Sequence, residues 1–87
     1  MCKPIEGNLV HPKTEIDVVP LAGSSRSLIR KAHKGTSFTL TKDNKGLTEG
    51  PDPNAPNCFI VLFDWGRRAI LRVSLPHTQL KGVELQT

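Results

Sequence analysis

The residues best suited to chemistry in this 87-residue chain are its only tryptophan and two adjacent arginines. Trp65 is followed, after one glycine, by Arg67 and Arg68, in the middle of the run from Asn57 to Pro76. Guanidinium groups bind phosphates and an indole ring stacks on a base, a combination that single-stranded nucleic-acid binders use. The trio therefore predicts a nucleic-acid contact. The alternative is that Trp65 plugs the end of a barrel while the arginines keep a sheet edge soluble.

A second group of basic residues lies between positions 26 and 34. In a helix, residues 26, 30 and 34 fall on one side, and this positive stripe repels itself unless an anion faces it. The alternative is a solvated helix face. Arg72 should point away from the aliphatic row of its strand, either onto an open sheet surface or toward an acid on a neighbouring strand. The predicted nucleic-acid-binding residues are Arg26, Arg30, Lys31, Lys34, Trp65, Arg67, Arg68, Arg72 and Lys81.

Catalytic and metal chemistry have little support. The three histidines, at positions 11, 33 and 77, are far apart and form no H-x-x-x-H or C-x-x-C pattern, so no metal or cofactor is expected. Cys58 is followed by Phe-Ile-Val-Leu and should be a buried, inert residue. Asp43, Glu49 and Asp52 should be solvated carboxylates on a loop rather than an acid–base pair in a walled pocket. We expect a protein that is not an enzyme.

Composition and charge limit the class of protein. The net charge is +4, and from Gly66 to Gly82 there are four basic residues and no acid, a segregation that attracts polyanions. No window approaches 18 apolar residues, and the N-terminus lacks the apolar core of a signal peptide, so the chain should be cytoplasmic, with no membrane partner. Only 37% of residues are hydrophobic. Such a thin core predicts a homodimer or higher oligomer.

The elements that position these residues are mainly strands. Residues 57–76 predict a β-hairpin with a sharp turn at 64–66. Residues 36–41 predict a half-exposed strand, with residues 38 and 40 inward, and residues 79–85 a last short strand. Residues 25–34 predict a short helix capped by Ser24-Ser25 and ended by Gly35, with a strand at 27–29 as the alternative. Residues 1–23 predict an arm with one short edge strand, and residues 42–57 a long, extended surface loop.

Taken together, these elements predict a mainly β domain over residues 24–87. Its centre should be a small, strongly bent or barrel-like antiparallel sheet of about five strands, with one short helix near residues 25–34. The arm at 1–23 would precede this domain and could be lent to a neighbouring subunit.

The order of elements resembles the carbon storage regulator family, small dimeric β-proteins that bind GGA-containing loops in messenger RNA and block translation. The matching residues are Leu28, Arg30-Lys31, Gly35, Phe38, Leu40, Gly66, Leu71, Val73 and Pro76. Two extra residues separate Arg30-Lys31 from Gly35, and the family's key arginine in the last strand falls at Gly82 beside Lys81. More distantly, residues 25–85 are similar to Sm-type RNA chaperones, which have an N-terminal helix followed by a bent five-stranded sheet.

These features predict a small oligomeric protein that binds RNA, or another single-stranded nucleic acid, and regulates by occupying its site. The alternative is a protein-binding module, for instance a phage or mobile-element accessory or assembly protein. Such a module would join partner chains by adding a strand at an exposed sheet edge.

Overall fold

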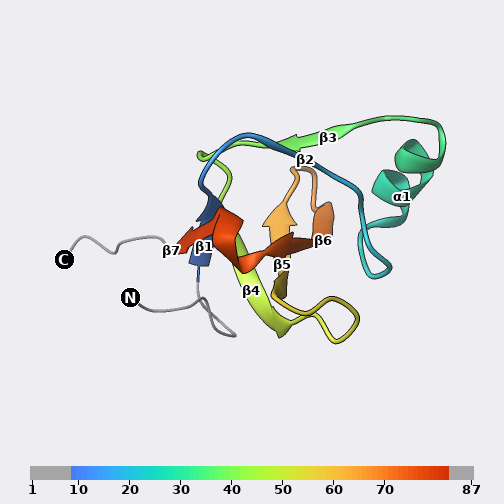
Figure 1. Ribbon diagram of the computed structural model, residues 1–87. Helices are drawn as coiled ribbons and strands as arrows, with labels where there is room; N and C mark the ends of the chain where they lie inside the picture. The colour runs from blue at the N-terminus through green and yellow to red at the C-terminus, as the bar shows by residue number, and fades with distance from the viewer. Residues whose placement is uncertain (1–8, 83–87) are drawn as a thin grey trace.

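The computed structural model describes residues 9–82, which form a five-stranded antiparallel sheet, a two-stranded sheet and one short helix (Figure 1). The large sheet has the strand order β6-β5-β4-β1-β7, and the small sheet pairs β2 with β3. The predicted mainly β fold is confirmed, although the large sheet is open and not a closed barrel. The elements are β1 (Leu9–Pro12), β2 (Ile16–Val18), α1 (Arg26–His33), β3 (Phe38–Leu40), β4 (Gly46–Pro51), β5 (Cys58–Asp64), β6 (Ile70–Pro76), the 3₁₀ turn His77–Gln79 and β7 (Leu80–Gly82).

The predicted hairpin is confirmed as β5 and β6, which pair from Cys58↔Pro76 to Asp64↔Ile70, but its turn lies at residues 66–69 and not at 64–66. The apolar residues at positions 71, 73 and 75 are buried on the inner face. They alternate with more exposed residues, because successive side chains of a strand point to opposite faces. Cys58 was expected to be buried, but it is half-buried at the start of β5.

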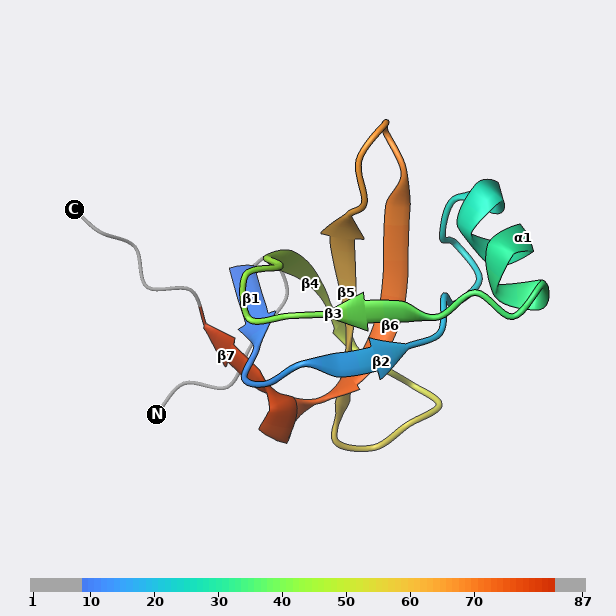
Figure 2. The same ribbon diagram turned by 90° about the horizontal axis from the view of Figure 1, so that it is seen from above.

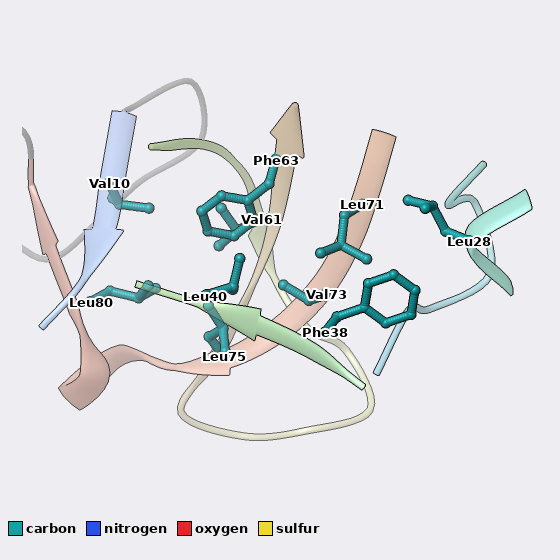
Figure 3. Packing of buried hydrophobic residues seen from close by; sticks show 10 residues of the cluster. All are labelled: Val10, Leu28, Phe38, Leu40, Val61, Phe63, Leu71, Val73, Leu75 and Leu80. Carbon is teal, nitrogen blue, oxygen red and sulfur yellow. The ribbon is translucent and has the colours of Figure 1, made fainter. Parts of the chain in front are cut away.

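The core lies between the two sheets. In Figure 2, β2 and β3 cross in front of β5 and β6, so the small sheet covers the inner face of the large one. Figure 3 shows Phe38 and Leu40 of β3 pointing toward Val61, Phe63 and the aliphatic residues of β6. Burial of each such side chain contributes about 1.5–3 kcal/mol. The predicted inward positions 38 and 40 are therefore confirmed.

The helix is also confirmed, over Arg26–His33, and the alternative strand at 27–29 is wrong. Leu28 packs in the core, and Gly35 follows the helix with φ +92°, a conformation that glycine adopts without strain. The expected cap by Ser24-Ser25 is wrong in one respect: Ser25 is at the N-cap position, but its side chain makes no capping hydrogen bond to the helix. Its Oγ accepts a hydrogen bond from Ile70 N (2.8 Å), and its N–H donates to the Ile70 carbonyl (2.9 Å). Ser25 thus fixes the start of α1 to the first residue of β6.

The expected loop at 42–57 is wrong for residues 46–51, which form β4 in the middle of the large sheet. Gly46 and Thr48 face inward and are buried, and Gly50 is also buried. A Cβ on Gly46 would lie 2.6 Å from Val61 Cγ1, so only glycine lets β4 approach β5 this closely. The strand bulges between Thr48 and Gly50. Residues 53–57 turn back toward β5 and do not run extended.

The N-terminal segment contributes two strands where one edge strand was expected. β1 lies between β4 and β7, inside the large sheet, and β2 pairs with β3. β7 is the predicted last strand, and its predicted members Val83 and Leu85 lie outside the described residues, as does Cys2. Within residues 9–82, no helix is long and apolar enough to cross a membrane.

Candidate nucleic-acid interface

The tip of the β5–β6 hairpin is a tight turn with two arginines at its centre. Ala69 N donates to the Gly66 carbonyl (2.7 Å), and Arg67 and Arg68 between them have φ values of 46° and 61°. Two consecutive positive φ angles are the pattern of a type I′ turn, for which Asn-Gly is preferred. Residues with a Cβ are strained there by roughly 1–2 kcal/mol each. The tip therefore holds two exposed arginines at positions where other residues would be more stable.

The start of α1 lies beside this tip. Ser25, which immediately precedes Arg26, is hydrogen-bonded to Ile70, which lies two residues after Arg68. Standard residue spacings place the Cα atoms of Arg26 and Arg68 no more than about 16 Å apart. Figure 2 shows the N-terminal end of α1 nearer to the hairpin tip than its C-terminal end. Arg30 is one helical turn further along. We call Arg26, Arg30, Arg67 and Arg68 the tip–helix surface.

The arginines of the tip–helix surface are exposed and have no carboxylate partner among residues 9–82. Asp64, the acid nearest in sequence to the tip, accepts a hydrogen bond from Gly66 N (2.9 Å). Unpaired guanidinium groups on one surface create a positive potential that attracts anions. The structure thus brings together two basic groups that are about 40 residues apart in the chain.

The remaining predicted residues do not all belong to this surface. Lys31 is exposed on α1, and Lys34 follows at its far end. Lys81 lies on β7, at the opposite edge of the large sheet from β6. Arg72 and Trp65 have partners of their own within the fold.

Arg72 connects β6 to β4 and to the segment before α1 through hydrogen bonds. Its Nε donates to Glu49 Oε2 (2.9 Å) and its Nη1 to the Ala22 carbonyl (2.7 Å). The hydrogen bonds to Glu49 raise the pKa of Arg72 and lower that of Glu49. Of the two alternatives for Arg72, pairing with an acid is confirmed, but Glu49 lies on β4, beyond the adjacent strand β5. The backbone of Arg72 also bonds Ser24 Oγ and Leu21 N, so this residue anchors the segment before α1.

Trp65 packs against the core at the hairpin end. Its ring is half-buried and meets Phe38 edge to face, with ring centroids 6.0 Å apart. This contact corresponds to the plugging role predicted as the alternative to base stacking. A base could use only the part of the indole that stays exposed.

The loop carboxylates have structural roles. Glu49, expected to be solvated, pairs with Arg72. Asp52 accepts hydrogen bonds from Ser74 Oγ (2.6 Å) and Asn54 N (2.9 Å), and these bonds lower its pKa. Asp43 is exposed in the turn after β3. Across the described part of the chain, no three histidine, cysteine or acidic side chains are grouped as they would be in a metal site.

Comparison with known proteins finds no match: no family model fits the chain, and no curated protein or solved structure is significantly similar to it. The resemblances to carbon storage regulators and to Sm-type chaperones stay predictions from the sequence.

Proposed function

We propose that this protein binds single-stranded RNA in the cytoplasm through the tip–helix surface, and acts by occupying the RNA without turning over a substrate. The observation that carries the proposal is the arginine pair in the left-handed turn. A strained conformation at a surface tip is expected where function favours it over stability. Here the residues that bear the strain are the two that best contact phosphates.

The arrangement favours contacts to the nucleic-acid backbone. The tip–helix surface contains four guanidinium groups, while the one tryptophan packs on Phe38. Binding should therefore depend on phosphates more than on bases, with modest sequence preference and strong salt dependence. A flexible single strand can bend from the protruding tip onto α1. RNA is proposed over DNA because of the resemblance to RNA-binding families.

Charge reversal with a matched control tests the proposal. Arg67→Glu with Arg68→Glu changes the net charge by −4, as does Lys13→Glu with Lys42→Glu at exposed positions after β1 and β3. Fluorescence anisotropy with an unstructured RNA at ~50 mM salt should show that the affinity of the tip variant falls at least about 30-fold. The loss of affinity of the control variant should be several-fold smaller than this. Equal losses of affinity in the two variants would mean that only the net charge matters and not the position of the arginines. Absence of RNA binding by the wild-type protein would reject the proposal.

The alternative, strand addition by a protein partner, has less support at β6. The outer edge of this strand is occupied by the segment before α1. Leu21 N donates to the Arg72 carbonyl (2.7 Å), and Ser25 bonds both backbone groups of Ile70. A paired edge does not offer the free backbone groups that strand addition needs. Strand addition is therefore disfavoured at the edge of the sheet that lies next to the tip–helix surface.

A further inference from the structure

The outer face of the large sheet carries a row of aliphatic side chains. In register, Leu9 of β1 lies opposite Leu47 of β4, Leu47 opposite Leu62 of β5, and Leu62 opposite Arg72 of β6. Their chain neighbours, such as Val10 and Val61, are buried in the core, so these four side chains point the other way. Leu9 is 45% exposed and Leu47 is 43% exposed. We call this set the outer-face row.

Within residues 9–82, Leu9 and Leu47 of the outer-face row stay exposed, while at the other end Leu62 is half-buried and Arg72 bonds Glu49 and the Ala22 carbonyl. Leu28 of α1 and Phe38 and Leu40 of β3 all belong to the core cluster on the inner side. Figures 1 and 2 show β2 and β3 gathered on that same side of the large sheet. An antiparallel sheet with one solvated face usually carries polar side chains there. Three leucines in register across neighbouring strands indicate a surface that is covered by another molecule.

The charges around the row fit an identical face. At its end, Arg72 is neutralised by Glu49, so the row brings no unpaired charge into a contact. Asp64 lies two residues after Leu62 on β5, and Lys45 lies two residues before Leu47, so both are at the same end of the outer face. A two-fold rotation that places Leu47 of one copy over Leu62 of the other also places Lys45 near the other copy's Asp64, which brings acid near base. A strongly charged partner would find no matching field on this face.

We propose that two copies of this chain pack through their outer-face rows about a two-fold axis near Leu47 and Leu62. In this arrangement each Leu47 meets the other copy's face near Leu62, and each Leu9 meets the aliphatic stem of Arg72. A two-fold interface uses the same patch on both copies, as this geometry does. The tip–helix surface stays outside the contact. The proposal is independent of RNA binding, and a dimer would present two such surfaces.

Light scattering and sedimentation test the dimer. Wild-type protein should have twice the mass of one chain at tens of micromolar. Leu47→Glu should weaken association by at least ~100-fold, because it would bury an unpaired charge. The matched control is Val19→Glu, a substitution immediately after β2, at a residue that is 73% exposed and away from the row. Val19→Glu should remain dimeric.

Isotope-filtered NMR on a mixture of labelled and unlabelled wild-type chains keeps the proposal falsifiable if Leu47→Glu fails to fold. Intermolecular NOEs should connect methyl groups of Leu47 and Leu62. A wild-type monomer at ~200 μM would overturn the proposal, since it puts any dimer dissociation constant above that range. A dimer whose NOEs come from β7 or α1, or binding of neutral lipid vesicles by a monomer through Leu47, would also overturn it.

Discussion

Replacing the two tip arginines with the residues that their turn prefers should stabilise the protein. Arg67 and Arg68 have φ values of 46° and 61°, and each side chain with a Cβ costs roughly 1–2 kcal/mol in this region. Asn tolerates it and Gly has no Cβ, so Arg67→Asn with Arg68→Gly removes most of the strain. Glycine adds unfolded-state entropy that offsets about 0.5–1 kcal/mol of the gain. The free energy of unfolding should therefore rise by about 1–3 kcal/mol.

Urea denaturation followed by tryptophan fluorescence measures this gain. The midpoint should increase with no change in the m-value, because the surface exposed on unfolding is the same. The thermal midpoint should rise by at least about 4 °C. Arg67→Glu with Arg68→Glu is the control, since both residues keep a Cβ in the same conformation, and its stability should stay within about 0.5 kcal/mol of wild type. An Asn-Gly variant no more stable than wild type would refute the strain argument.

Three further predictions concern the segment before α1 and the loop acids. Gly23→Ala should lower the free energy of unfolding by about 1–2 kcal/mol, because Gly23 has φ +100° and its Cβ would lie 2.9 Å from Arg72 Cδ; urea denaturation measures the loss, and an unchanged midpoint would contradict it. Arg72→Gln should lower stability by about 1 kcal/mol through loss of the bond to the Ala22 carbonyl, yet leave RNA affinity within about twofold; a loss of affinity equal to that of the tip variant would place Arg72 in the interface. The pKa values of Glu49 and Asp52 are lowered in the folded protein, so their carboxylates stabilise the folded state above their ordinary pKa values of 4.5 and 3.8. Stability should therefore fall as pH drops through the lower pKa values of the folded state. Thermal midpoints from pH 6 to pH 2 measure this fall, and the Glu49→Gln with Asp52→Asn variant should show a flatter pH profile.

The sequence predicts those elements whose side chains carry a clear period. The alternation around Leu71 and Val73 fixed β6 and its inner face, and the apolar run at Cys58–Asp64 indicated its partner β5. The helix was readable from Leu28 and its neighbours together with Gly35.

β4 could not be read in the same way, because its inner face is made of glycine and threonine. Gly46 and Gly50 look like turn residues in the sequence, but Gly46 is small so that Val61 and Phe63 can approach. What marks this strand is its register with β5, and pairing between distant segments leaves little local signal. The interior position of β1 was not predicted either, because it also depends on pairing with distant segments.

The candidate site shows a similar division. The basic residues were visible individually, and the positions of Arg67 and Arg68 at the tip followed from the hairpin. Their left-handed conformation, and the Ser25–Ile70 bonds that bring Arg26 beside them, are tertiary features without a sequence signature. For Arg72, pairing with an acid was one of two open alternatives, and Glu49 as the partner depends on the unpredicted β4.

The salt dependence of RNA binding tests the central claim most directly. For a single strand, the slope of log affinity against log salt is about −0.7 for each phosphate neutralised. Four arginines of the tip–helix surface predict a wild-type slope near −2.8, and loss of two in the more stable Arg67→Asn with Arg68→Gly variant should bring it to about −1.4. Equal slopes for the two proteins would contradict the account, because the tip arginines would then not contact the RNA.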